Sequence, residues 1–417
     1  MTLLQIASLL IVLAAVFGTV NYLFLRLPSA IGILIVAFAA SLCVLVLDAV
    51  FPAAGMADQV RALVTGIDFD ETLLEGMLGL LLFAGALHVK ISDLKSEWLI
   101  VLLMATLGVA LSTVIAGVGF AMITGMPILI ALVFGALISP TDPVAVLGVL
   151  REANLRKSLE TKIAGESLFN DGVGYVVFLV LTGLAFGGSG HGAGAEDGSA
   201  VADAALLFVQ EAAGGAALGL VLGFVTFRVM RRIDDYALEV LLTLALAFGG
   251  YELAILLHVS APIMAVCAGL LIGDVGHRDA MSAQTRRYVD AFWTLIDEIL
   301  NAVLFLMIGF EVFAVAFGID ALIAGVLGIG LSLIARFAAV AVPVTLLRPF
   351  RGFSPGVVRV MTWGGLKGGI SVALALSLPE GEWKPLILTV TYMIVLFSIV
   401  VQGLTVAPLA RRLTPEG

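Results

Sequence analysis

The segment AGESLFNDGVGYVVF, Ala164–Phe178, places Glu166, Asn170 and Asp171 inside a run that is otherwise apolar. The run is long enough to cross a lipid bilayer, which takes about 20 mainly apolar residues in a helix. A charged side chain at the centre of a bilayer costs roughly 2.5–3.5 kcal/mol even on the lenient insertion scale, so such residues mark candidate functional sites. The segment therefore predicts a membrane-spanning helix with a functional site inside it.

Helical spacing divides the polar residues of this segment between two faces. Ser167 and Asp171 are four residues apart on one face, while Glu166 and Asn170 form the same kind of pair on the adjoining face. Asp171 is about 13 Å into the helix at a rise of 1.5 Å per residue, close to the bilayer midplane. We expect the first face to offer oxygen atoms to a cation and the second to hold a structural charge against a basic partner.

The composition of the whole chain is that of an integral membrane protein. Of its 417 residues, 61% are hydrophobic and 13% are charged, and the mean hydropathy is +1.14. Soluble domains are close to half apolar and a quarter charged, and long apolar runs indicate helices rather than barrel strands. Only 22 residues are Lys or Arg, which excludes a broad basic surface for nucleic acid. Cys43 and Cys267 both fall in apolar segments, so we expect no disulfide.

Apolar runs separated by polar breaks predict thirteen transmembrane helices. Their approximate bounds are 2–24, 29–50, 71–88, 97–124, 127–150, 162–187, 205–230, 236–258, 260–276, 286–316, 319–347, 356–379 and 385–410. The first run has no positively charged region and no small-residue cleavage site before it ends, so it is interpreted as a span rather than a signal peptide.

The positions of Lys and Arg support this count. With the N-terminus outside, the outward loops hold only Arg61 and Lys384, and the spans hold only Arg336 and Lys367. All other Lys and Arg residues then lie in inward loops or at the C-terminus, as the positive-inside rule requires. We therefore expect a multi-pass protein of the cell (inner) membrane with a cytoplasmic C-terminus. We also expect no soluble C-terminal domain.

A second motif is SPTDPVAVL, Ser139–Leu147. Pro140 and Pro143 each lack an N–H group and prevent a helical hydrogen bond, so the helix should be interrupted around Thr141 and Asp142. An interruption at this depth is tolerated only where the backbone lines a cavity or is buried in protein.

A third motif is WGGLKGGISVALALSLP, residues 363–379, in which four glycines surround Lys367 near mid-span. Each half of the chain thus has one interrupted helix, acidic in the first half and basic in the second. Interrupted helices at matching positions in two halves are typical of secondary transporters built from inverted repeats.

Together, SPTDPVAVL, GESLFNDGVG and GGLKGGISVALALSLP resemble the monovalent cation:proton antiporter family, which includes bacterial NhaP-type and animal sodium/proton exchangers. Milder similarity at 257–273 and 292–312 extends the resemblance over most of the chain. It implies an all-α membrane protein of about 13 helices, with inverted repeats and two crossing broken helices, as in the NhaA/NhaP-like antiporter fold. It also implies a homodimer. We expect one transmembrane domain over 1–417, with a mobile core at about 97–187 and 319–410 and a scaffold at about 1–88 and 205–316.

The resemblance also implies roles for individual residues. At the matching positions, Asp142, Ser167 and Asp171 would bind the cation with their side chains, and Thr141 would bind it with its backbone carbonyl. Hard oxygen ligands of this kind suit an alkali cation, and we expect no cofactor besides the transported cation and H⁺.

A second group of residues would brace the core. The resemblance pairs Glu166 with Arg336, places Asn170 in a hydrogen bond nearby, and lets Lys367 stabilise the crossing of the broken helices. Many relatives have an acidic residue in the third helix where this chain has Ala84. Many also have Arg in place of Lys367, which keeps the charge without the planar fork.

These residues predict a secondary active antiporter that exchanges Na⁺, or else Li⁺ or K⁺, for H⁺ and so contributes to pH homeostasis. A cation and a proton would compete for Asp171, and an Asn–Asp pair resembles the branch that exchanges one cation for one proton. The alternatives on the same fold are a K⁺/H⁺ antiporter, a uniporter and a sodium-coupled symporter. A channel is less expected because no continuous polar stripe appears, and an enzyme because no nucleophile–base pair or zinc motif does.

Two further features of the spans have a structural interpretation. Gly215, Gly219 and Gly223 form a stripe of small residues, interpreted as close packing within the chain, with a dimer contact as the alternative. Asp297 and Asn301, with neighbouring acidic residues, are interpreted as satisfied polar groups of the helix bundle, with an entrance funnel as the alternative.

Overall fold

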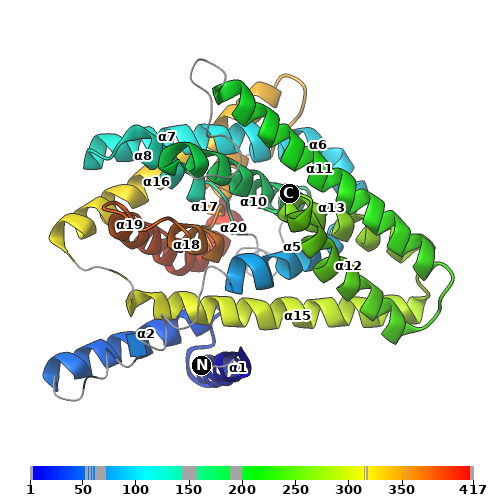
Figure 1. Ribbon diagram of the computed structural model, residues 1–417, viewed down its shortest axis with the longest axis horizontal. Coiled ribbons are helices and arrows are strands. Elements are labelled where there is room, and N and C mark those ends of the chain that lie inside the picture. Colours follow the sequence, from blue (N-terminus) through cyan, green and yellow to red (C-terminus); the bar gives the residue numbers. More distant parts are fainter. Residues whose placement is uncertain are drawn as a thin grey trace.

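The protein is described here by a computed structural model in which every regular element is a helix over the described residues (Figure 1). These residues are 3–51, 55, 58, 60–61, 72–142, 157–187, 200–313, 315, 318–354 and 356–413. Helices suit an apolar chain of this kind, because a helix satisfies its own backbone hydrogen bonds where lipid offers none.

The helical elements follow one another with short connections. In the first half they are α1 (Leu3–Val20), η1 (Asn21–Leu25), α2 (Ser29–Val50), η3 (Thr72–Met77), α5 (Leu78–Leu87), α6 (Ile91–Leu103), η4 (Met104–Gly108), α7 (Val109–Thr124), α8 (Ile128–Leu137) and α10 (Lys157–Phe186). In the second half they are α11 (Ala200–Met230), α12 (Tyr236–Leu256), α13 (Ala261–Leu271), η5 (Ile272–Gly276), α14 (His277–Asp279), α15 (Ala283–Phe310), η6 (Glu311–Phe313), α16 (Ile319–Leu347), α17 (Val357–Trp363), α18 (Gly369–Leu376), α19 (Lys384–Phe397), η7 (Ser398–Gln402) and α20 (Gly403–Leu413).

Each of the thirteen predicted ranges contains helix, although several predicted starts are wrong. The helix predicted from 97 begins at Ile91, and the one predicted from 162 begins at Lys157, because their polar first turns are helical although they are not apolar. The predicted range 127–150 is described only to Asp142. Within the described residues, eight helices are long and apolar enough to cross a membrane. The count of thirteen spans stays a prediction.

The helices pack in two neighbouring groups. In one, α7 packs against α8 and α16, and α10 packs against α6 and α8. In the other, α13 packs against α5, α11 and α12, while the long α15 packs against α2. Figure 1 shows α15 running beneath the first group and above α1 and α2.

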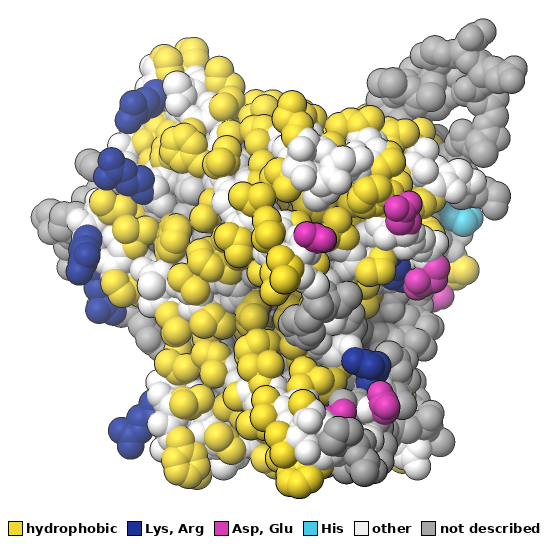
Figure 2. All heavy atoms as spheres, turned by 90° about the vertical axis from the view of Figure 1, so that its left-hand side faces the viewer, with side chains coloured by type: hydrophobic (Ala, Val, Ile, Leu, Met, Phe, Trp, Pro, Cys, Tyr) yellow, Lys and Arg dark blue, Asp and Glu magenta, His cyan; other side chains and the backbone are white. Residues whose placement is uncertain are grey.

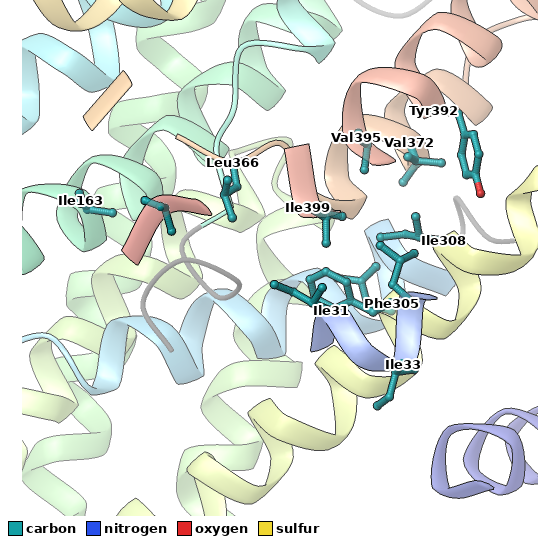
Figure 3. Packing of buried hydrophobic residues seen from close by; sticks show 14 of the residues in the cluster. Ile31, Ile33, Ile163, Phe305, Ile308, Leu366, Val372, Tyr392, Val395 and Ile399 are labelled. Atoms are coloured by element: carbon teal, nitrogen blue, oxygen red, sulfur yellow. The ribbon is translucent and has the colours of Figure 1, made fainter. Parts of the chain in front are cut away.

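Side-chain packing explains these contacts. Phe120 of α7 stacks on Phe134 of α8 with 4.0 Å between ring centroids, and Phe83 of α5 lies 4.7 Å from the Trp293 ring of α15. Figure 3 shows Phe305 of α15 beside Ile31 of α2, in the same buried cluster as Leu366.

The glycine stripe of α11 packs within the chain, as predicted. A Cβ on Gly215 would collide with the Ser260 carbonyl oxygen, and a Cβ on Gly219 would collide with that of Met264, both on the start of α13. The small residues therefore let the α11 and α13 backbones approach closely.

The outer surface is mainly hydrophobic, as a surface in lipid should be. Large exposed side chains include Leu220, Phe224 and Val225 of α11 and Ile323 and Val326 of α16. Figure 2 shows one apolar face with most visible Lys and Arg along one margin and Asp and Glu towards the other.

Candidate functional site

Two helix breaks meet inside the first group of helices. The first follows α8, where the described backbone from Ser139 to Asp142 is not helical. The second is the extended stretch 364–368 between α17 and α18. Both interruptions occur where the prolines and glycines predict them. Pro143 and the rest of the first motif lie outside the described residues.

The two breaks are joined by hydrogen bonds. The Asp142 backbone N–H donates to the Leu366 carbonyl oxygen at 2.8 Å. The Lys367 ammonium donates to the carbonyl oxygens of Ser139 at 2.9 Å and Pro140 at 3.3 Å. The broken backbone is thus satisfied by the opposite break rather than by its own helix, as burial away from water requires.

The charges at the crossing complement the helix ends. Lys367, 3% exposed, lies at the C-terminal end of α8, where carbonyl groups create a partial negative charge. Asp142 lies against Gly368, next to the N-terminal end of α18, where the partial charge is positive. These contacts agree with a helix-end role for Lys367.

Polar side chains that the sequence did not single out complete the second break. The Ser398 hydroxyl accepts from the Lys367 backbone N–H at 2.8 Å and donates to Gln402 at 2.7 Å. The Gln402 amide then donates to the Trp363 carbonyl oxygen at 3.0 Å. Ser398 and Gln402 are an i,i+4 polar pair in an apolar span, which was the available signal.

The opening motif faces the first break from α10. Its polar residues are all buried, with Asp171 at 5%, Ser167 at 2%, and Glu166 and Asn170 at 1% exposure. The Asn170 amide donates to the Thr141 hydroxyl at 2.8 Å, and the Thr141 backbone N–H donates to Asn170 at 3.3 Å. The hydroxyls of Thr141 and Ser167 are 3.1 Å apart. Asn170 thus holds the broken backbone of Thr141.

Glu166 and Arg336 form a buried ion pair. The two guanidinium Nη atoms each contact one Glu166 oxygen, one of them at 2.9 Å, and Arg336 also donates to the Met361 carbonyl oxygen at 3.1 Å. A Cβ on Gly365 would collide with this guanidinium, so the glycine leaves room for it. The pair joins α10 to α16 and α17.

A cavity of about 670 Å³ leads to the carboxylates. Asp142 and Asp171 line it together with Gly368 and Ser371, and the exposed His88 and Lys90 line it elsewhere. One oxygen of Asp171, Oδ1, is buried and has no hydrogen-bond partner among the described residues. The site therefore presents a buried oxygen ligand at the helix crossing.

Ala84 does not line this cavity. It is fully buried in the cluster around Phe83, and its carbonyl oxygen contacts His88 Nδ1 at 2.7 Å. Its neighbour Gly85 lines the cavity.

Two crossed helix breaks with buried carboxylates at the crossing define a secondary transporter of the inverted-repeat class. The chain belongs to the family described as "Sodium/hydrogen exchanger, transmembrane", whose model matches residues 10–412. It is therefore an all-α, multi-pass membrane protein, as predicted.

Known members of this class are similar over nearly the whole chain. The Na(+)/H(+) antiporter NhaP of Pseudomonas aeruginosa is 47% identical over 98% of this chain and 97% of its own. The Na(+)/H(+) antiporter NhaH of Halobacillus dabanensis is 35% identical over 83% of this chain and 84% of its own. The solved structure of the sodium proton antiporter MjNhaP1 from Methanocaldococcus jannaschii at pH 8 has a TM-score of 0.76 and covers 100% of both chains at 20% identity, so the predicted fold class is confirmed.

Proposed function

We propose that the protein exchanges Na⁺ for H⁺ across the membrane, one for one, with Asp171 binding either ion. The buried, unpartnered Oδ1 of Asp171 at the inner wall of the cavity is the observation that supports this most directly. The names of the Na(+)/H(+) antiporters that are similar over most of the chain support the choice of ions.

The cation ligands would be Asp142, Asp171, Ser167 and the Thr141 carbonyl. The 3.1 Å contact between the Ser167 and Thr141 hydroxyls brings α10 and the first break to one point. Because one of the two hydroxyls must donate in that contact, the other oxygen keeps a free hydrogen-bonding capacity. Oxygen ligands favour a hard alkali cation.

Coupling would follow from the cost of a bare carboxylate in an apolar barrier. An ionised and empty Asp171 is penalised inside the membrane, whereas the same group carrying Na⁺ or H⁺ is compensated. The core can then cross the barrier only when loaded. Asn170 is neutral and bound to Thr141, so one exchangeable charge remains on this helix, which supports electroneutral exchange.

Glu166, Arg336 and Lys367 would keep the core rigid while it moves. We assign the moving core to α6–α10 and α16–α20 and the scaffold to α1–α5 and α11–α15, which follows the two packing groups. We further propose a homodimer, with the N-terminus outside and the C-terminus in the cytoplasm. The cavity, bordered by Lys90 and Asp93, would then face the cytoplasm.

Exchange in vesicles tests this proposal. Purified protein in proteoliposomes should dissipate an imposed pH gradient when NaCl is added, and Asp171→Asn should abolish this exchange. Asp320→Asn, which changes an exposed carboxylate at the start of α16, is the matched control and should retain it. Exchange that persists in Asp171→Asn would refute the proposal.

The same vesicles separate the alternatives. LiCl and KCl in place of NaCl identify the preferred cation, and an imposed voltage that changes the rate would argue against one-for-one exchange. An organic anion requirement would identify a symporter.

A further inference from the structure

A polar stripe of α15 lines the same cavity as the two carboxylates. Its members are Thr294, Asp297, Glu298 and Asn301, which recur every three or four residues and therefore share one helix face. The proposed scaffold thus contributes oxygen atoms to a cavity whose carboxylates belong to the proposed core.

Asn301 is held in one orientation. Its Nδ2 donates to the Asp297 carbonyl oxygen at 2.7 Å and to the Asp297 carboxylate at 3.0 Å. Both amide hydrogens have acceptors, so exchanging the N and O positions of the amide would lose both bonds. Asn301 is 4% exposed, and its Oδ1 has no partner in the described part of the chain.

This oxygen lies one helical turn from the crossing. Leu304 follows Asn301 by about 4.5 Å along the helix axis. A Cβ on Gly369, the first residue of α18, would collide with the Leu304 side chain. Ser371 of α18 is 1% exposed, lines the cavity, and has a hydroxyl with no partner within the described ranges.

The interpretation of Asn301 as a satisfied polar group is therefore incomplete. An unpaired buried acceptor costs roughly 1–3 kcal/mol, and no bond in the bundle compensates for Oδ1. Asn301 Oδ1, Ser371 Oγ and Asp171 Oδ1 come from three different helices and line one cavity. An alkali cation takes neutral and charged oxygen ligands of this kind.

We propose that Asn301, positioned by Asp297, binds the transported cation on its way to Asp171, with Ser371 as its partner on α18. This inference rests on the proposed cation/proton exchange. Asn301 is on the scaffold and Asp171 is on the core, so the cation has both ligands only while the cavity faces the side described here. Asn301 should therefore set the apparent affinity from that side and have little influence on the maximal rate.

The test measures KM for Na⁺ separately from each face, in vesicles of defined orientation. Asn301→Leu should raise KM about tenfold at the cavity face, as loss of one ligand bond would, and change the opposite face less than about twofold. Ser371→Ala should raise KM at the cavity face in the same direction. Asn301→Asp keeps an oxygen there and should retain a KM near that of the unmodified protein. Gln284→Leu removes an exposed amide from the same helix and should change neither face.

The outcomes separate this inference from the proposed function. If the unmodified protein shows no cation-dependent proton exchange, the proposed function fails. If it does exchange, but Asn301→Leu leaves KM unchanged on both faces and only lowers the unfolding temperature, Asn301 is structural and this inference fails. If Asn301→Leu does not fold, Ser371→Ala decides, and an unchanged KM at the cavity face would overturn the inference.

Discussion

At the scale of single residues, the Glu166–Arg336 pair shows what a buried charge requires. Both side chains are almost inaccessible, and each compensates for the other. Removing one partner leaves an uncompensated charge, which costs roughly 3–5 kcal/mol. Glu166→Gln should therefore lower the unfolding temperature in detergent strongly, while the preference among Na⁺, Li⁺ and K⁺ stays the same. Unchanged stability with altered cation preference would contradict the bracing role.

Gly368 tests how closely the two breaks approach. A Cβ there would lie 2.5 Å from the Cβ and from one carboxylate oxygen of Asp142, so Gly368→Ala must displace the carboxylate or the backbone. Overpacking of this kind costs roughly 1–3 kcal/mol, and here it would also move a proposed cation ligand. We expect a large loss of exchange rate in vesicles. Gly330→Ala, where a Cβ meets open space in α16, should retain full exchange, and equal rates in the two variants would contradict the close approach.

The site residues that could be predicted from the sequence are those with a charge at depth. Asp142, Asp171 and Lys367 are conspicuous because ionised groups are costly in an apolar span. Ser371 and Asn301 are neutral, and neutral polar residues are common bonds between helices, so their free oxygen atoms become evident only from the fold. The partner of Asn170 was also hidden, because Thr141 reaches it through a helix break.

At the scale of elements, Lys367 links the ends of two half-helices. Its ammonium is the printed donor to both carbonyl oxygens of the first break, Ser139 and Pro140. Lys367→Met would leave those acceptors unpaired at the negative end of α8, with a cost of roughly 1–3 kcal/mol for each lost partner. We expect a lower unfolding temperature together with slower exchange. Lys367→Arg keeps the charge and should recover part of both, whereas equal losses in the two variants would show that shape rather than charge matters.

Element type was more predictable than element ends. Apolar runs indicated the helices, and Pro140 and the glycines around Lys367 indicated the breaks, since each removes a specific backbone option. The starts of α6 and α10 were missed because ISDLKSEW and KSLETK are helical but polar, and hydropathy does not detect such turns.

At the scale of the whole molecule, the two packing groups leave a cavity at each end of their interface. One contains Asp171. The other, about 790 Å³, lies between Tyr175 and Ser377 of the proposed core and residues of α11, α12 and α13. Its residues do not include Asp142 or Asp171. The arrangement matches a transporter with its site accessible from one side.

Cysteine labelling tests this sidedness and the membrane orientation together. Cys43 and Cys267 are free thiols and are first replaced by alanine. Ala164→Cys then places a thiol in the Asp171 cavity, and Ser377→Cys places one in the opposite cavity. A membrane-impermeant maleimide should label Ala164→Cys faster from the cytoplasmic face and Ser377→Cys faster from the outer face.

The two variants act as controls for each other, because a leaky vesicle would label both from either side. Reversed labelling of both would invert the orientation that the Lys and Arg positions predict, while leaving the fold intact. Equal labelling of Ala164→Cys from both faces in sealed vesicles would be more serious, since the carboxylates would then reach water on both sides at once. Such a pathway would conduct cations instead of coupling them to protons, because no loaded state would be needed to cross the barrier.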